Sequence, residues 1–519
     1  MMQTIKLDES KYLSEQISVE QVMEWSNSKV VLDCATGMGK TTLINEMVAK
    51  VAGDKNARVL FLSSRTALTE QQIKNINGLG VKNMDVKTYQ WLENLLERGE
   101  EDKINKDRYA FIVCDECHYF TNDATFNNNT QMSYKWIEKQ PTVIYMSATG
   151  DVVFKYMRQK KSVDWYYYTD MDYSKVSTIT FCHSDEHMID CIKTIYDSGE
   201  KAIVFMDKLK KDGGLGTRVH SPMMNWLLHH KEDCHFLCSK SRTEYDSINE
   251  FDTAIQDGKF QKQFLFCTQA LDVGIDIKDE QCKHVIVEMF DVDTVMQCLG
   301  RIRDKSNAHY YIRVYDKKTL VGKAQTLKNN FIDKAKKLKQ MNQEERWEFC
   351  MKGTTFDSHK GLFYIDILDD KKIKVNELLL YKYEHIYGQY QTAMHGYGAD
   401  SELSSHSHVA RWKYDFVEIA NFKGQFIDLA EKDEQNFRNQ MDSYLQSIKD
   451  VRLDKDAQLK LVERLNVKGS NGALRKTPKV LNDWLIKNGY NYVITTNQYK
   501  LGGVRYTGWM VSNKSTVNS

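Results

Sequence analysis

The sequence predicts an α/β protein with two lobes, each built on a parallel sheet, followed by a mostly helical C-terminal region. Short apolar runs alternate with helical patterns over the first 320 of the 519 residues. These runs are continuous rather than alternating, which is typical of strands buried on both faces of a parallel sheet. The strand pattern stops after residue 320. A chain of this length allows roughly three to four domains, at about 150 residues each.

The strand-like runs fall into two series, separated by a polar, tyrosine-rich stretch near residues 150–176. The first series occupies residues 29–34, 58–64, 84–89, 110–116 and 142–149. The second occupies residues 177–183, 201–206, 235–239, 263–268, 284–289 and 310–315. Strands that alternate with helices form layered α/β domains. We therefore expect a first lobe over residues 1–165 and a second lobe over residues 166–320.

The residues after 320 are expected to form two further parts. A long, polar helical pattern covers residues 323–350, and a less regular segment reaches about residue 450. That segment includes a Ser/His-rich stretch, residues 400–410, which we expect to be an exposed loop with solvated histidines. The last fifty residues show two helical patterns and then two strands around Leu501-Gly502-Gly503, which is the order of a winged-helix end. We expect a helical accessory region over 321–450 and a winged-helix-like module over 451–519.

Composition excludes several classes of protein. Hydrophobic residues make up 41% and charged residues 28% of the chain, which is typical of a soluble globular protein. No stretch approaches the roughly 18 uncharged apolar residues that a transmembrane helix needs. The N-terminal residues lack the apolar core of a signal peptide, so we expect a cytoplasmic protein without membrane association. The formal net charge of +1 argues against a histone-like polycation.

The eleven cysteines indicate buried thiols rather than disulfides or a zinc site. Several of them lie inside strand-like runs, where a free cysteine behaves as a small hydrophobic residue. Neither Cys114 with Cys117 nor Cys234 with Cys238 has a second pair at the spacing of a structural zinc site. We expect a reduced chain.

A glycine-rich loop directly follows the first strand-like run and precedes a helical pattern. Residues 34–42 read Cys-Ala-Thr-Gly-Met-Gly-Lys-Thr-Thr, although the first glycine of the usual phosphate-loop pattern is Cys34 here. Glycines let the backbone approach phosphates closely, and a helix N-terminus adds N–H donors. We expect Lys40 to neutralise phosphate charge and the Thr41 hydroxyl to ligate Mg²⁺. The expected nucleotide-binding residues are Thr36, Gly37, Met38, Gly39, Lys40, Thr41 and Thr42.

Two adjacent carboxylates end the strand-like run 110–116. Asp115-Glu116-Cys117-His118 stands where parallel α/β sheets bind ligands, at the carboxyl end of a strand. We expect Asp115 to hold Mg²⁺ and Glu116 to polarise the water that attacks the γ-phosphate. An acidic turn without function is the alternative for this segment alone.

These motifs, with Ser147-Ala148-Thr149, occur in the order and spacing of the superfamily 2 DExH-box helicases. The chain resembles that family over about 300 of its 519 residues, including residues 63–71, 88–92, 264–277 and 297–303. The resemblance implies two tandem RecA-like lobes that bind ATP and Mg²⁺ between them. The form Gly300-Arg301-Ile302-Arg303 is similar to that of phage or plasmid helicases and of origin-binding helicases.

The resemblance also implies roles for residues of both lobes. Gln297 and Arg301 would reach the γ-phosphate from the second lobe, so that hydrolysis depends on lobe closure. Arg303 lies one residue before the family's final arginine position, which Asp304 occupies here. Asp276 would help to sense the nucleotide or the closure state. The residues expected to contact nucleic acid in the two lobes are Ser64, Arg65, Thr88, Thr268 and Gly274.

The basic charge of the chain is concentrated at its C-terminus. Residues 468–519 contain eight basic residues and one acidic residue, a net charge of +7 that leaves −6 for the other 467 residues. A basic module with several aromatic residues suits duplex or junction DNA, and we expect Lys476, Lys479, Lys500 and Arg505 to contact it. The alternative is a small solvated domain, and we expect Trp484 and Trp509 to belong to its core.

The expected function is that of an ATP-dependent DNA helicase or translocase in phage or mobile-element replication or recombination. Its partners would be single-stranded, forked or duplex DNA and replication or recombination proteins, and its location the cytoplasm of a bacterial host. Two alternatives remain open. One is an ATP-dependent RNA helicase, which the absence of a clear DEAD-box Q motif disfavours, and the other is an origin-binding initiator or sensor in which ATP gates DNA recognition.

Overall fold

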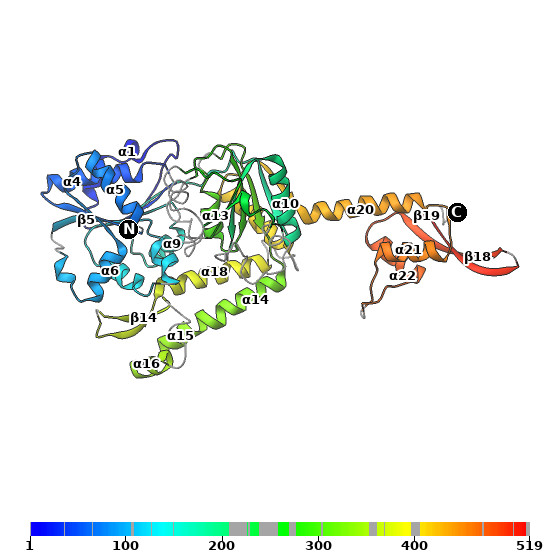
Figure 1. The fold of residues 1–519 in the computed structure, drawn as a ribbon. Coiled ribbons are helices and arrows are strands. Elements are labelled where there is room, and N and C mark those ends of the chain that lie inside the picture. The colour runs from blue at the N-terminus through cyan, green and yellow to red at the C-terminus, as the bar shows by residue number, and fades with distance from the viewer. Residues whose placement is uncertain are drawn as a thin grey trace. The chain divides into compact units, whose positions relative to one another are not determined.

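The chain divides by its internal contacts into two units, Met1–Ile427 and Asp428–Ser519 (Figure 1). The computed structural model describes residues 2–35, 37–64, 66–104, 108–125, 127–148, 150–206, 226, 229–237, 258–268, 277–302, 305–351, 361–367, 369–395, 405–469, 472–501 and 503–514. The first unit contains both expected lobes and most of the accessory region. None of the described helices is long and apolar enough to cross a membrane.

The first lobe is a seven-stranded sheet in which all neighbouring strands are parallel. Its strands, in spatial order, are β1 (Gln3–Lys6), β7 (Trp165–Tyr168), β2 (Lys29–Asp33), β6 (Val143–Ser147), β5 (Tyr109–Asp115), β3 (Arg58–Ser63) and β4 (Met84–Thr88). The five strands expected from the sequence are confirmed. β1 and β7 extend the sheet beyond β2, so the lobe includes residues up to Tyr168, three more than the sequence indicated.

Helices cover both faces of this sheet. Alternate residues of each strand point to opposite faces, so each strand contributes to two hydrophobic cores. Val30 and Leu32 of β2 pack in one hydrophobic core with the continuous helical segment α3 (Lys40–Leu43), η1 (Ile44–Val48) and α4 (Ala49–Asp54). Val31 packs in the opposite core with α6 (Tyr89–Glu97), α8 (Thr130–Glu138) and α9 (Asp151–Gln159). The continuous apolar pattern of β2 is therefore explained by burial on both faces.

The second lobe is another seven-stranded sheet, and the six strands expected from the sequence are confirmed as parallel neighbours. In spatial order the strands are β10 (Cys234–Leu237), β11 (Phe264–Cys267), β9 (Lys201–Met206), β12 (Cys282–Glu288), β13 (His309–Arg313), β8 (Thr178–Cys182) and β16 (Gln425–Asp428). β16 was not expected. It brings the chain back to this sheet after the accessory region.

The accessory region is more regular than its sequence indicated. Its elements are α14 (Lys317–Leu327), η8 (Lys328–Ile332), α15 (Asp333–Gln340), α16 (Gln343–Met351), β14 (Phe363–Asp366), β15 (Lys372–Val375), α18 (Glu377–His395), α19 (Ser405–Tyr414) and η9 (Asp415–Ile419). The single helix expected over 323–350 is interrupted before α16, where Asn342 and Glu345 cap the new helix reciprocally. The expectation of solvated histidines is wrong for His408, which lies in α19 and is 1% exposed.

The second unit has a hydrophobic core of its own. It consists of α20 (Leu429–Ser447), β17 (Arg452–Leu453), α21 (Lys455–Leu465), α22 (Pro478–Lys487), β18 (Tyr492–Leu501) and β19 (Val504–Asn513), with the strands in the order β17-β19-β18. Both helices and both long strands expected from the sequence are present. Met441 and Leu445 of α20 pack in this core, which explains why the unit begins at residue 428 rather than 451. Trp509 lies in the core and Trp484 packs against it, as expected.

Candidate nucleotide-binding site

The glycine-rich loop lies between the carboxyl end of β2 and the start of α3. Gly37 and Gly39 have φ angles of +87° and +79°, the left-handed region that glycine adopts without strain. Lys40 Nζ donates to the carbonyl oxygens of Cys34 at 2.7 Å and Ala35 at 3.0 Å, so its charge lies within the curve of the loop. Lys40 is also the first residue of α3, whose initial N–H groups have no partners inside the helix. This arrangement suits an anionic phosphate.

The N-terminal segment covers this loop. The backbone N–H of Leu13 donates to the carbonyl oxygen of Met38 at 2.9 Å, and a Cβ atom at Gly39 would lie 3.4 Å from the ring of Tyr12. The Met38 side chain is buried in the hydrophobic core. Only the backbone of this expected nucleotide-binding residue is therefore left for a ligand. Thr36 lies outside the described residues, and Thr41 and Thr42 occupy the first turn of α3.

The two carboxylates follow β5 at the same sheet edge as the glycine-rich loop. β6 lies between β2 and β5, and all three strands are parallel, so their carboxyl ends meet. Glu116 has a φ angle of +48°, which is uncommon for a residue other than glycine and costs of order 1–3 kcal/mol. The preceding residue is fixed by Tyr89, whose hydroxyl donates to the carbonyl oxygen of Asp115 at 2.9 Å. Such strain is typical of a functional site.

Ser147 and His118 hold the Glu116 carboxylate from two sides. Ser147 Oγ donates to Glu116 Oε2 at 3.1 Å, and His118 Nδ1 lies 3.2 Å from the same oxygen. His118 Nδ1 and Ser147 Oγ are themselves 3.1 Å apart. Two motifs that are separate in sequence therefore form one polar cluster, here called the carboxylate cluster (Glu116, His118 and Ser147).

The charges around the two carboxylates separate their pKa values. Burial, with the adjacent charge of Glu116, raises the pKa of Asp115. Burial also raises the pKa of Glu116, but the hydrogen bond and charge of His118, together with the charges of Lys40 and Arg301, outweigh it and lower the pKa. Glu116 is consequently the carboxylate that is kept ionised, as a group that orients or polarises water must be.

The second lobe contributes to this site through α13 (Val292–Leu299) and the residues that follow it. Gln297 and Arg301 are both buried, and the charge of Arg301 acts on Glu116 across the two lobes. A small cavity between the lobes is lined by His118, Thr121, Asn122, Gly150, Val152, Val153, Asp291, Asp293, Thr294, Gln297 and Lys382. Two further expected residues, Arg303 and Asp276, lie outside the described residues.

The donor set at the sheet edge fits a magnesium ion. Mg²⁺ prefers oxygen ligands and is commonly held by one or two protein groups together with phosphate oxygens. Thr41 supplies a hydroxyl at the start of α3, and Asp115 supplies a carboxylate at the end of β5, beside the phosphate-binding loop. The charge of Lys40 acts on Asp115, which indicates that the two sides of the site are close.

The residues expected to bind nucleic acid differ widely in their surroundings. Ser64 is 1% exposed, and the Thr88 hydroxyl caps α6 by accepting from the Trp91 N–H at 3.1 Å. Thr268 is half-buried after β11, whereas Arg65 and Gly274 lie outside the described residues. The four basic residues of the second unit, Lys476, Lys479, Lys500 and Arg505, are all exposed.

Two residues near the site were not expected there from the sequence. Tyr12 was not expected near the loop, although it is an aromatic residue upstream of it. Lys382 was assigned to the accessory region, yet it lines the cavity between the lobes. Only tertiary packing brings it there.

Comparisons with known proteins give one family match and several structural likenesses. Residues 10–85 match the family model described as ResIII, type III restriction enzyme, res subunit. No curated protein matches the chain. The matched residues lie in the first lobe and include the glycine-rich loop.

Several solved structures are similar to this chain at low sequence identity. One is S. cerevisiae Dbp5 bound to RNA and ADP BeF3, at 15% identity and a TM-score of 0.41, covering 58% of this chain and 82% of that chain. Another is the E. coli DExH-box NTPase HrpB, at 13% identity and a TM-score of 0.39, covering 57% and 40%. A third is Mycobacterium smegmatis helicase Lhr bound to ssDNA and AMP-PNP, at 15% identity and a TM-score of 0.39, covering 59% and 46%.

Proposed function

We propose that the chain is an ATP-dependent DNA helicase or translocase of the DExH type. The observation that carries this proposal is the convergence of Lys40, Glu116 and Arg301 from two lobes. The charges of both basic residues lower the pKa of the Glu116 carboxylate. A phosphate-binding loop, an ionised carboxylate and an arginine from a second lobe are the groups that phosphoryl transfer requires.

We infer a role in hydrolysis for each of these groups. Lys40 and the loop N–H groups bind the phosphates, and Thr41 and Asp115 would hold Mg²⁺, which neutralises phosphate charge when bound. Glu116, held by Ser147 and His118, orients the attacking water. Arg301 stabilises the charge that develops on the γ-phosphate, with Gln297 beside it. Since Arg301 belongs to the second lobe, hydrolysis depends on the approach of the lobes, and that dependence couples ATP turnover to movement.

The second unit supports DNA as the polymer. Two helices are followed by the β18–β19 hairpin, and β17 pairs with β19, which is consistent with the winged-helix-like module expected from the sequence. Lys500 and Arg505 face each other near the end of the β18–β19 hairpin, and Lys476 and Lys479 stand at the start of α22. Exposed lysine and arginine side chains bind phosphates without reading the base sequence. A role in phage or mobile-element replication or recombination, in the cytoplasm, stays a prediction from the sequence.

The test is the ATPase activity of the full chain, titrated with single-stranded DNA, forked DNA, duplex DNA and RNA. We expect DNA to stimulate hydrolysis more than RNA does. Lys40→Ala should lose activity through the phosphate site, and Glu116→Gln should lose turnover while it still binds ATP. Stimulation by RNA alone would favour an RNA helicase. Absence of stimulation by every polymer, or full activity of Lys40→Ala, would overturn the proposal.

A further inference from the structure

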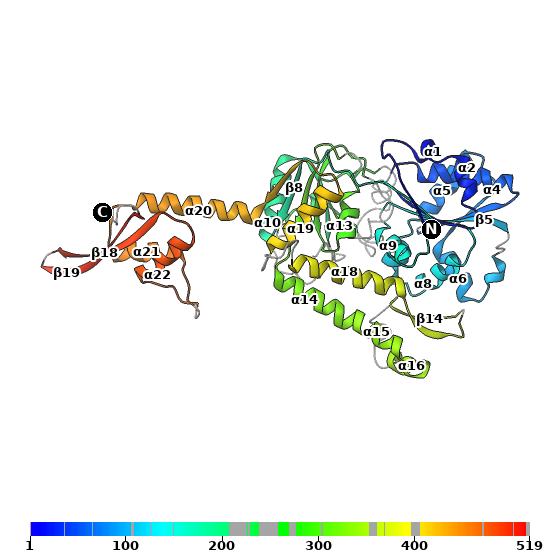
Figure 2. The ribbon, with the colours of Figure 1, turned by 180° about the vertical axis from the view of Figure 1, so that it is seen from behind.

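α18 contacts both lobes of the first unit (Figures 1 and 2). At its N-terminal end, the Leu378 N–H donates to Gln131 Oε1 at 3.2 Å, and Lys382 Nζ donates to Asn122 Oδ1 at 2.7 Å, both in the first lobe. Toward its C-terminal end, Tyr390 stacks on Phe290 of the second lobe with ring centroids 3.9 Å apart. One helix of the accessory region is therefore attached to both halves of the ATPase core.

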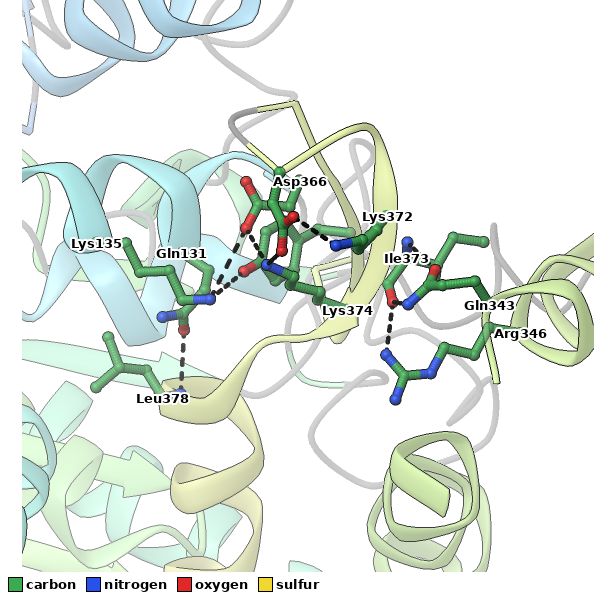
Figure 3. A network of polar contacts seen from close by, with 11 residues as sticks. Gln131, Lys135, Gln343, Arg346, Asp366, Lys372, Ile373, Lys374 and Leu378 are labelled. Atoms are coloured by element: carbon green, nitrogen blue, oxygen red, sulfur yellow. Dashed lines mark hydrogen bonds and ion pairs between the residues drawn. The ribbon is translucent and has the colours of Figure 1, made fainter. Parts of the chain in front are cut away.

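The attachment to the first lobe is reinforced by the β14–β15 hairpin that leads into α18 (Figure 3). Lys135 of α8 donates to the Tyr364 hydroxyl at 2.8 Å and lies 3.9 Å from Asp366, which also pairs with Lys374 at 3.0 Å. On the other side, Arg346 of α16 donates to the carbonyl oxygen of Ile373 at 3.0 Å. The hairpin is held between α8 and α16, so the start of α18 is fixed relative to the first lobe.

The contact with the second lobe is made at the N-terminus of α13. Gln389 Oε1 accepts from the backbone N–H of Val292 at 3.2 Å, and this N–H has no partner inside its own helix. His385 Nε2 accepts a hydrogen bond from Gln389 Nε2 at 2.9 Å and so orients the Gln389 amide, and it lies 3.3 Å from Asp293 Oδ2. Arg411 Nη1, from α19, donates to the carbonyl oxygen of Gln389 at 2.9 Å, and this hydrogen bond fixes the backbone of α18 at Gln389.

These contacts reach the two halves of the site that must approach each other. Asn122, the partner of Lys382, ends α7 (Tyr119–Asn122), which begins directly after His118. Val292, whose N–H donates to Gln389, is the first residue of α13, which carries Gln297 and leads to Arg301. Lys382, His385 and Gln389 are three and four residues apart, so they share one face of α18.

We propose that α18 fixes the position of α13 relative to the carboxylate cluster. His385 and Gln389 are then positioning residues for hydrolysis. This inference rests on the proposed function, because positioning Arg301 matters only if the site hydrolyses ATP. Neither residue touches the nucleotide in this account. They act on α13 and, through it, on Gln297 and Arg301, so their loss affects the rate of hydrolysis rather than the binding of ATP.

The test is a double-mutant cycle on the contact between His385 and Gln389, in the full chain and with saturating DNA. We expect His385→Ala and Gln389→Ala each to lower kcat about tenfold, with the KM for ATP within about twofold of the wild type. The double variant should be no slower than either single variant, because both remove the same contact. His385→Gln, whose side-chain carbonyl can still accept from the Gln389 amide, should recover most of the rate.

Glu384→Gln is the matched control. Glu384 precedes His385 on α18 but pairs with Lys336 of α15, at 2.9 Å, and it has no ion pair with the described residues of either lobe. We expect wild-type kcat for this variant. Three results would overturn the proposal. They are an unchanged kcat in His385→Ala, an equal loss of kcat in Glu384→Gln, and a loss in the double variant that equals the product of the two single losses. Failure of the proposed function would appear differently, as a wild-type chain whose hydrolysis no polymer stimulates.

Discussion

Ser147→Ala tests whether the carboxylate cluster acts in hydrolysis. Ser147 is fully buried, and its hydroxyl donates to Glu116 Oε2 at 3.1 Å. A hydrogen bond to a charged group contributes about 1.5–3 kcal/mol. His118 keeps its contact with the same oxygen, so we expect a loss near the lower limit. If that loss falls on the transition state, kcat decreases about tenfold, at about 1.4 kcal/mol for each factor of ten.

The assay is steady-state phosphate release with saturating ATP and DNA, together with urea unfolding. Ser133→Ala is the matched control, because Ser133 is also buried and donates to a buried carboxylate, Glu93 Oε1, at 2.9 Å. Glu93 does not belong to the site. Both variants should lose about 1–2 kcal/mol of unfolding free energy, and only Ser147→Ala should lose kcat. Wild-type kcat in Ser147→Ala, or an equal loss in Ser133→Ala, would refute the role of the cluster.

Three further predictions concern other parts of the chain. Gly361→Ala should lower the free energy of unfolding by more than about 2 kcal/mol in a urea titration. Gly361 has a φ of +76°, and an added Cβ would overlap the carbonyl oxygen of Ala124. An unchanged free energy of unfolding would show that the segment leading into the β14–β15 hairpin does not pack against Ala124. Burial lowers the pKa of His408 to about 3. Below the unfolded pKa of about 6.5, the unfolded state therefore binds a proton that the folded state does not bind. The free energy of unfolding then decreases by up to about 1.4 kcal/mol for each pH unit that the pH is lowered. Melting curves from about pH 7 to pH 4 should show this fall in the wild type and not in His408→Gln, and parallel curves would contradict it. In the second unit, alanine should be substituted for Lys476, Lys479, Lys500 and Arg505. The slope of the logarithm of the DNA-binding constant against the logarithm of the salt concentration should become shallower by up to about 3.6, at about 0.9 per phosphate contact, with ATPase activity retained. An unchanged slope would argue against contact by these four residues.

The sequence predicts the central strands well because their burial is visible in it. β2 and β6 are covered on both faces, and such strands appear as continuous apolar runs. The edge strands lack that signal. β1 reads QTIK with mostly exposed residues, and β16 reads QFID with a single buried one. A four-residue strand of mixed polarity cannot be distinguished from a loop by periodicity alone.

The site was predictable where one short segment carries both the backbone geometry and the reactive groups. The glycine-rich loop and Asp115-Glu116 meet that condition. The α18 contacts do not, because Lys382 and Gln389 are ordinary helical residues whose partners lie 260 and 97 positions away. His408 shows the opposite error. A Ser/His-rich composition indicates an exposed loop, but packing against Phe290 and Trp412 buries the ring.

Arg301→Ala tests most directly whether one ATPase site is built from both lobes. The measurement is single-turnover phosphate release in the presence of DNA, alongside the affinity for a fluorescent ATP analogue. We predict unchanged nucleotide affinity, because the phosphate-binding loop belongs to the first lobe, and a rate of hydrolysis lowered at least about a hundredfold. A variant that hydrolyses ATP at the wild-type rate would contradict the account.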